Sequence, residues 1–247
     1  MADQFSRTRL LVGDEPLARL AAAKVAVFGV GGVGGLCVEA LARAGVGTLH
    51  LYDDDTVSES NLNRQIVALH STIGQPKAEV MARRILDINP ACQVEVFRMF
   101  YLPENADQVD LSQYDYVVDC IDTVAAKLDL VERCTALQVP ILSAMGSGNK
   151  LDPTAFRVTD LSKTQGCPLA RVMRKELRKR GITHLKVVYS TEEPLTPLQP
   201  AEEEAPAGTD TRPRSTARRA TPGSISFVPA AAGLVAASAV IRDLGGF

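Results

Sequence analysis

Four glycines in the spacing Gly29-x-Gly31-Gly32-x-Gly34, with Asp53 following, are residues that could hold a nucleotide. Glycines let the backbone turn sharply and approach phosphate oxygens closely, because no Cβ stands in the way. A helix that starts there would add free N–H groups and the positive end of its dipole. Asp53 is spaced to accept hydrogen bonds from ribose hydroxyls. The alternative is a glycine-rich tight turn that holds no ligand.

The elements that must position these residues can be predicted on both sides of the glycines. Apolar runs at 25–28 and 49–52 predict strands, and the pattern at 36–44 predicts a helix between them. Further strands are expected at 94–97, 114–120 and 140–144, with helices from 76 to 88 and from 125 to 137. This alternation predicts an α/β, Rossmann-like fold with a mostly parallel sheet and helices on both faces.

Several polar residues are expected at the carboxyl edge of that sheet, where such folds bind ligands. The glycines, Asp53, Asp122 and Gly146 all follow predicted strands. Arg64 and Lys77 are candidates to neutralise β- and γ-phosphates, and Asp122 is a candidate to hold Mg²⁺. A nicotinamide cofactor would often need a Tyr-x-x-x-Lys pair, which the chain lacks. ATP is therefore favoured over NAD.

The second half of the chain, 151–247, extends the ATP-binding half, 1–150, within one expected domain. A strand is predicted at 156–161, followed by a two-faced helix at 169–180. Its apolar side is expected to carry Leu169, Val172, Met173 and Leu177, and its other side carries Arg171, Arg174, Lys175, Arg178 and Lys179. A phosphate backbone is the natural partner for such a strip, and a solvated charged face is the alternative.

The segment 192–223 is rich in proline and in runs of like charge, which predicts a flexible loop. Strand-like sequences at 186–189 and 224–228 suggest that this loop joins two strands. The apolar stretch 230–244 is expected to be a helix packed on the sheet. A membrane anchor is the alternative, but Pro229 and several serines interrupt the stretch.

Composition narrows the class of protein further. The chain has 247 residues and a net charge of −2, which argues against wholesale coating of nucleic acid but allows a local basic patch. Its five cysteines form no CxxC pair, and its start has no signal-peptide core, so a reduced, cytoplasmic protein is expected. Cys167, in a polar context, is either a sulfur relay or an incidental thiol.

Several motifs together resemble the E1-like superfamily of adenylating enzymes. They are the glycine motif, Asp53-x-Asp55, Asn61-Leu62-Asn63-Arg64-Gln65, Gly74-x-x-Lys77 and Asp119-Cys120-Ile121-Asp122. The resemblance implies that a carboxylate attacks the α-phosphorus of ATP to give an acyl adenylate. It implies that Asp53 contacts ribose, that Arg64 and Lys77 bind phosphates, and that Asp122 positions magnesium. It further implies a homodimer in which Arg7 reaches the partner's ATP.

Within that superfamily, two stretches resemble the tRNA threonylcarbamoyladenosine dehydratase group, and the resemblance covers nearly the whole chain. The similar stretches are 144–154 and 167–182. The resemblance implies activation of the threonylcarbamoyl carboxylate on adenosine-37 of tRNA, ring closure by attack from within the same substrate, and tRNA phosphates on the basic helix. Two alternatives stay open. One is adenylation of the C-terminal carboxylate of a small sulfur-carrier protein, with Cys167 relaying sulfur, and the other is a nucleotide-binding partner without activity. A cysteine-desulfurase or sulfur-acceptor system is a further candidate partner.

Overall fold

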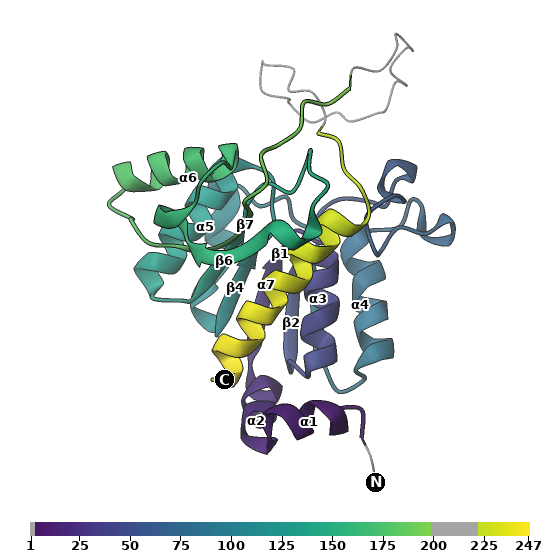
Figure 1. The fold of residues 1–247 in the computed structure, drawn as a ribbon. Helices are drawn as coiled ribbons and strands as arrows, with labels where there is room; N and C mark the ends of the chain where they lie inside the picture. The colour runs from purple at the N-terminus through teal and green to yellow at the C-terminus, as the bar shows by residue number, and fades with distance from the viewer. Residues whose placement is uncertain (1–2, 199–221) are drawn as a thin grey trace.

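Seven strands form one sheet in the computed structural model, which describes residues 3–198 and 222–247 (Figure 1). The strands are β1 (Lys24–Phe28), β2 (Thr48–Tyr52), β3 (Gln93–Phe97), β4 (Tyr116–Asp119), β5 (Ile141–Ala144), β6 (Phe156–Asp160) and β7 (Lys186–Ser190). The helices are α1 (Ser6–Val12), α2 (Asp14–Ala22), α3 (Gly34–Ala44), α4 (Lys77–Ile88), α5 (Val124–Leu137), α6 (Pro168–Lys179) and α7 (Phe227–Gly245).

In the strand order, β3-β2-β1-β4-β5-β7-β6, the strand that leads into the glycine motif, β1, lies next to the central strand, β4. From β1 the chain builds outward through β2 and β3, and then returns to the other side of β1 with β4. All neighbouring strands are parallel except β6, which runs antiparallel to β7 at one edge. The order therefore reverses between β1 and β4, and ligands of open α/β sheets bind beside such a switch point.

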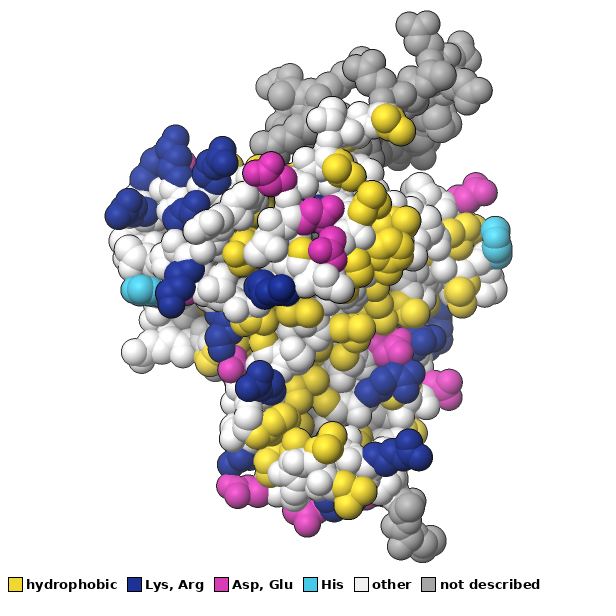
Figure 2. Space-filling model, viewed as in Figure 1, with side chains coloured by type: hydrophobic (Ala, Val, Ile, Leu, Met, Phe, Trp, Pro, Cys, Tyr) yellow, Lys and Arg dark blue, Asp and Glu magenta, His cyan; other side chains and the backbone are white. Residues whose placement is uncertain are grey.

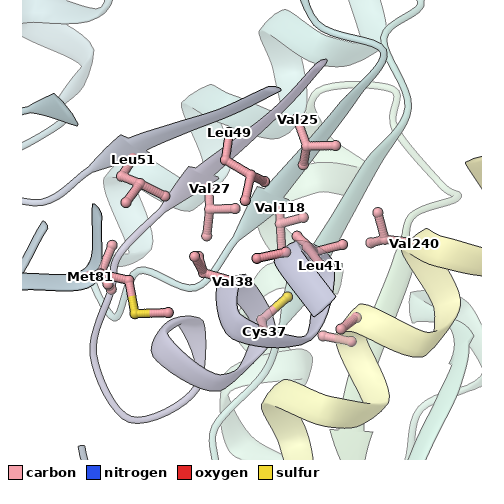
Figure 3. Packing of buried hydrophobic residues seen from close by; sticks show 14 of the residues in the cluster. Val25, Val27, Cys37, Val38, Leu41, Leu49, Leu51, Met81, Val118 and Val240 are labelled. Atoms are coloured by element: carbon pink, nitrogen blue, oxygen red, sulfur yellow. The ribbon is translucent and has the colours of Figure 1, made fainter. Parts of the chain in front are cut away.

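The two faces of the sheet are covered by different helices. Val25 and Val27 of β1 point into a core shared with α3, α4 and α7, and Figure 3 shows Leu49, Leu51 and Val118 filling the same layer. Phe28, two residues from Ala26 on the opposite face, packs with α5. Alternate residues of one strand thus bury on both faces, which explains why the parallel strands are nearly continuous apolar runs.

One sequence-based prediction is wrong at the end of the chain. The stretch 224–228 is not a strand, because α7 already begins at Phe227. Ile225 and Phe227 alternate with Ser224 and Ser226 and so imitate a strand pattern. Pro229, however, fits the first turn of a helix, where its missing N–H would have no partner anyway. The proline-rich loop therefore leads from β7 to a helix, and its central part, 199–221, lies outside the described residues.

The last helix, α7, packs along α3 and also touches α2. Val228, Ala232, Ala236 and Val240 recur every four residues and are buried on that side. Contact with α3 is close, because a Cβ at Gly233 would lie 2.2 Å from the carbonyl oxygen of Val33. Among the described residues, α7 is the one helix long and apolar enough to cross a membrane. Its buried face agrees with the expectation of a helix that packs on the rest of the protein, since α7 also contacts β5, β6 and β7.

Candidate nucleotide site and basic helix

The turn between β1 and α3 needs glycine at two positions for steric reasons. Gly29 has φ +87°, and a Cβ there would lie 2.9 Å from the carbonyl oxygen of Cys120 in the next loop. A Cβ at Gly34 would lie 1.8 Å from the carbonyl oxygen of Gly29. A side chain at Gly29 would therefore push the glycine loop, residues 29–34, away from the β4–α5 loop, and one at Gly34 would collide with the backbone of the glycine loop itself.

The two middle glycines of the motif face different neighbours. Gly31 faces Gln65, whose Nε2 would lie 3.6 Å from an added Cβ. Gly32 instead faces Pro229 of α7, at 3.2 Å, and the backbone carbonyl of Arg64, at 3.7 Å. Gly31 therefore lies beside a polar side chain, whereas Gly32 leaves room for the first turn of α7.

Asp53 fixes the glycine loop with both carboxylate oxygens. Its Oδ2 accepts a 2.7 Å hydrogen bond from the Val30 N–H, and its Oδ1 accepts one of 2.9 Å from the Asp55 N–H. Burial raises the pKa of Asp53, and these N–H donors and the Lys77 charge oppose the shift. Each oxygen keeps a lone pair for a further donor, so the ribose contact implied by the resemblance is compatible with this geometry.

The two candidate phosphate-binding side chains both contact protein oxygens. Lys77, at the start of α4, is almost fully buried, and its Nζ lies 2.8 Å from Asp55 Oδ2. Arg64 donates from Nη1 to the Ser60 carbonyl at 2.8 Å and to Asn63 Oδ1 at 2.9 Å. Because an ammonium carries three donors and a guanidinium five, both side chains have further donors for phosphate oxygens.

The polar segment 61–65 contains two buried amide side chains, those of Asn61 and Gln65. Asn61 is buried, and its Oδ1 accepts a hydrogen bond of 3.2 Å from the Ser58 N–H, which fixes the turn. Gln65 is also buried, and its Oε1 is the one buried side-chain nitrogen or oxygen atom of the described residues that has no hydrogen-bond partner in the protein. Buried acceptors are normally satisfied by protein or water, so this oxygen is able to accept a hydrogen bond from a bound molecule.

Asp122 lies on the β4–α5 loop, three residues after β4, with its side chain exposed. Its Oδ1 accepts a long hydrogen bond, 3.4 Å, from the Thr123 hydroxyl. No group of three or more His, Cys, Asp or Glu side chains that could hold a metal ion occurs within residues 3–198 and 222–247. Mg²⁺ commonly takes one or two carboxylates and completes its shell with phosphates and water, so one exposed carboxylate fits that use.

Arg7 lies far from the glycine loop of its own chain. It is exposed on α1, which packs where α3 and α4 end. Phe5 contacts Gly45 just after α3, and Gln4 Nε2 donates to Asn89 Oδ1 just after α4, at 3.1 Å. Because α3 begins at the glycine loop, its 11 residues separate α1 from that loop by about 16 Å.

The basic side chains of α6 gather at one end of the molecule, seen as dark blue groups at the upper left of Figure 2. They line an open hollow and are Arg171, Arg174, Lys175, Arg178 and Lys179. The expected apolar side is buried at Met173 and Leu177, but Val172 is 43% exposed, so its predicted burial is wrong. The buried stripe of the helix is narrow and consists of Ala170, Met173 and Leu177, which follow one another at spacings of three and four residues.

The five basic residues are not equivalent in their contacts. Arg174 is half-buried, and its Nη1 donates to the Leu161 carbonyl, the Thr164 carbonyl and Thr164 Oγ1 at 2.6–3.0 Å. Lys179 pairs with Glu176 at 2.7 Å. The side chains of Arg171, Lys175 and Arg178 are exposed at spacings of four and three residues, which places them on one face.

The cysteines show no feature of a catalytic nucleophile. Cys167 was expected in a polar loop, but it is buried at the start of α6, where its Sγ accepts a hydrogen bond from the Ala170 N–H at 3.5 Å. Burial raises the pKa of the Cys120 thiol, beside the glycine loop, to about 12. A thiol is nucleophilic as its thiolate, so Cys120 is inert near neutral pH.

Sequence reasoning missed a buried ion pair beneath the nucleotide site. Lys127 Nζ lies 2.9 Å from Asp119 Oδ2, and both side chains have no exposure to solvent. The signal was present, since Asp119 ends an apolar strand and Lys127 interrupts the apolar side of a predicted helix. Only their burial together shows that they are partners.

Comparison with known proteins identifies the family of this chain. A model of the ThiF family matches residues 5–247. The chain belongs to the ThiF family.

Two relatives match this ThiF-family protein over nearly its whole length. The tRNA threonylcarbamoyladenosine dehydratase of Bacillus subtilis is 44% identical over 99% of this chain and 95% of its own. The crystal structure of Escherichia coli tRNA N6-threonylcarbamoyladenosine dehydratase, TcdA, in complex with ATP has a TM-score of 0.85 at 36% identity, covering 98% of this chain and 94% of that one. The same Escherichia coli protein has also been solved in complex with AMP.

A relative with a different activity matches a smaller part. The sulfur carrier protein ThiS adenylyltransferase of Escherichia coli is 37% identical over 54% of this chain and 53% of its own. The shared part is thus about half of each protein.

Proposed function

We propose that this ThiF-family protein is an ATP-dependent tRNA threonylcarbamoyladenosine dehydratase. The observation that carries the proposal is the similarity to proteins of that name along nearly the whole chain, from α1 to α7, and not only in the nucleotide-binding half. The geometry fits ATP as the nucleotide. The glycine loop admits close approach of phosphate, and the Gln65 carbonyl oxygen lacks a donor.

The proposed reaction has two steps on one substrate. The carboxylate of the N6-threonylcarbamoyl group on adenosine-37 attacks the α-phosphorus of ATP, pyrophosphate leaves, and an acyl adenylate forms. A nucleophile within the same modified nucleoside then attacks the activated carbonyl, and AMP leaves. The product is the cyclic form, which is one water lighter than the substrate. No cysteine nucleophile is needed, in accordance with the buried thiols.

The residues have distinct roles in this scheme. Asp53, with Asp55, Asn61 and Gln65, shapes the pocket for the nucleoside, and Arg64 and Lys77 turn free donors toward the phosphates. Asp122 would hold Mg²⁺, which would neutralise charge on the phosphate oxygens as pyrophosphate departs. Lys77 is held by Asp55, and its ammonium group has further N–H donors that a phosphate oxygen can accept.

The partners follow from the same proposal. The tRNA backbone lies along the exposed face of α6, and the protein works in the cytoplasm as a homodimer. Arg7 is separated from its own glycine loop by the length of α3, about 16 Å, which supports the proposal that it acts on ATP bound to the second subunit. Leu10 and Leu11, exposed beside it on α1, offer apolar surface for that contact.

The proposal is tested by incubating the protein with ATP, Mg²⁺ and tRNA that carries N6-threonylcarbamoyladenosine. We expect AMP, pyrophosphate and a tRNA nucleoside one water lighter by mass spectrometry. Formation of AMP only with a carrier protein that ends in Gly-Gly would favour a sulfur-carrier adenylyltransferase instead. ATP binding with no product from either substrate would indicate a nucleotide-binding partner without activity.

A further inference from the structure

A polar cluster lies inside the apolar layer between the sheet and α5. Asp119 is the last residue of β4, Ser143 is its register partner on β5, and Lys127 comes from the first turns of α5. All three side chains are completely buried. Lys127 Nζ lies 2.9 Å from Asp119 Oδ2, and the Ser143 hydroxyl donates to the same oxygen at 2.5 Å. Charged side chains are almost never buried to this degree unless they are paired.

The cluster holds the residue that precedes Asp122 by both of its backbone polar groups. The Ile121 N–H donates to Asp119 Oδ1 at 3.1 Å, and Lys127 Nζ donates to the Ile121 carbonyl at 3.0 Å. That carbonyl belongs to the peptide group that joins Ile121 to Asp122. Lys127 therefore fixes the orientation of the peptide from which the Asp122 side chain projects.

The same loop is packed against the glycine loop. The Cys120 N–H donates to the Phe28 carbonyl at 2.8 Å, and the position of a Gly29 Cβ lies 3.3 Å from the Ile121 nitrogen. A shift of Ile121 would therefore alter the distance between Asp122 and the phosphate-binding backbone. A buried group beneath both loops is well placed to set that distance.

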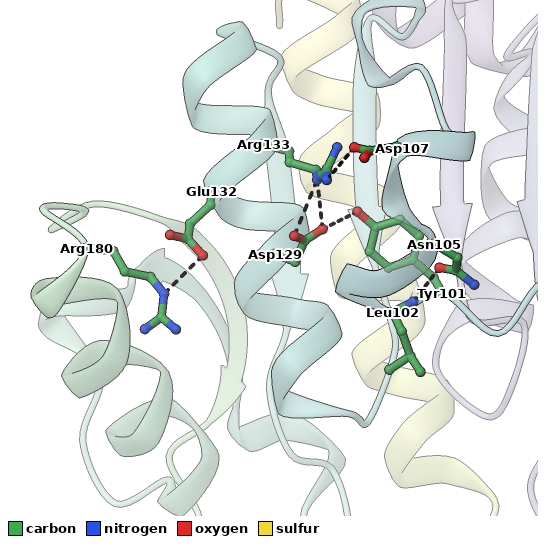
Figure 4. Close-up of polar contacts among 8 residues, drawn as sticks. All are labelled: Tyr101, Leu102, Asn105, Asp107, Asp129, Glu132, Arg133 and Arg180. Atoms are coloured by element: carbon green, nitrogen blue, oxygen red, sulfur yellow. Dashed lines mark hydrogen bonds and ion pairs between the residues drawn. The ribbon is translucent and has the colours of Figure 1, made fainter. Parts of the chain in front are cut away.

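Stability alone is a weak reason for such a cluster. Apolar residues of similar volume often replace a buried ion pair with no loss of stability, whereas removal of one partner leaves an uncompensated charge. The position of α5 also has other supports. Figure 4 shows Asp129 bound to Tyr101 and Arg133, Arg133 bound to Asp107, and Glu132 bound to Arg180 of the α6 end.

We infer that Asp119, Lys127 and Ser143 form a positioning cluster for the reaction, which holds the β4–α5 loop so that Asp122 faces the phosphates of ATP. This inference rests on the proposed function. Lys127 is its central residue, because it alone joins the Asp119 carboxylate to the Ile121–Asp122 peptide. It touches neither ATP nor tRNA, since it has no exposed surface.

The test separates positioning from stability with two variants. Lys127→Met leaves Asp119 unpaired and should lower the urea midpoint of unfolding. Lys127→Met with Asp119→Asn removes both charges, and the new amide can still bind the Ile121 N–H. We expect this double variant to regain most of the midpoint, while AMP formation on modified tRNA stays about 10- to 100-fold below wild type. Recovery of activity together with stability would overturn the inference.

A second measurement asks whether the effect passes through Asp122. ATP affinity is measured by calorimetry for the double variant, for Asp122→Ala, and for the two combined. We expect the combination to bind ATP no more weakly than Asp122→Ala alone, because both act on one contact. An equal further loss on the Asp122→Ala background would contradict the inference.

Two further variants complete the design. Arg133→Met removes an ion pair elsewhere on α5 and should leave ATP affinity unchanged. Ser143→Ala keeps both charges and should reduce AMP formation less than the double variant does, so it gives a reading even if the double variant does not fold. Full activity of Ser143→Ala in that case would count against the cluster. A wild-type protein without AMP formation would instead refute the proposed function.

Discussion

Asp122 is the side chain on which the proposed chemistry depends most directly. Asp122→Ala should abolish AMP formation, because no second carboxylate projects from the same loop to hold Mg²⁺. The side chain is exposed, so the free energy of unfolding should change by no more than about 0.5 kcal/mol. AMP release and thermal melting are measured on the same preparation. Asp87→Ala, at an exposed aspartate on α4, is the matched control and should stay active.

Gln65 permits a prediction in which binding and stability move in opposite directions. Its buried Oε1 accepts no hydrogen bond from another described group of the protein. Gln65→Leu therefore breaks no hydrogen bond within the protein at this oxygen, so unfolding by urea should occur at the same or a higher midpoint. The ligand loses its acceptor, so ATP should bind about tenfold more weakly. Parallel losses of stability and affinity would show that Gln65 is only a packing residue.

At the scale of elements, the basic residues of α6 include three that are exposed for binding and one, Arg174, that stabilises the neighbouring turn. Replacing Arg171, Lys175 and Arg178 with alanine should weaken tRNA binding and reduce the slope of log K against log salt by about one per residue, because each phosphate contact releases counterions. The measurement is a filter-binding or anisotropy titration across salt concentrations. An unchanged slope would make this side of α6 an ordinary solvated face.

Arg174 should behave differently from its three neighbours. Its guanidinium holds the Leu161 and Thr164 carbonyls, so it supports the turn between β6 and α6. Arg174→Ala should lower the free energy of unfolding by about 1–3 kcal/mol, since buried acceptors lose their donor. The salt slope should change little. A slope change without loss of stability would return Arg174 to the phosphate-binding set that the helical pattern predicts.

The sequence predicted features that depend on a single element, but it did not predict contacts that depend on how two elements pack together. Local periodicity predicted the strands from β1 to β7, the main helices and the glycine loop, because each signal lies within one segment. It predicted Val172 as buried, because the pattern of a helix does not tell how wide a stripe the neighbouring helix covers. The pairing of Asp119 with Lys127 depends on which side of α5 faces β4, which only the folded chain determines.

At the scale of the whole molecule, one candidate ATP contact, Arg7, lies apart from all the others. The strand order brings the glycine loop and Asp122 together beside the switch point, while α1 carries Arg7 to the far ends of α3 and α4. One chain therefore lacks a complete site if Arg7 is needed for activity. A symmetric dimer can supply it, because each subunit then lends α1 to the other.

Mixing two inactive variants tests this arrangement of the dimer. Arg7→Ala and Asp122→Ala should each be inactive alone. In a mixed dimer, the site of the Arg7→Ala subunit keeps Asp122 and receives Arg7 from its partner. Random exchange of equal amounts should restore about a quarter of wild-type activity, since half of the dimers are mixed and each has one complete site. AMP formation is followed after exchange, with unmixed variants as controls. No recovery, despite mixed dimers detected by native mass spectrometry, would show that Arg7 does not act across subunits.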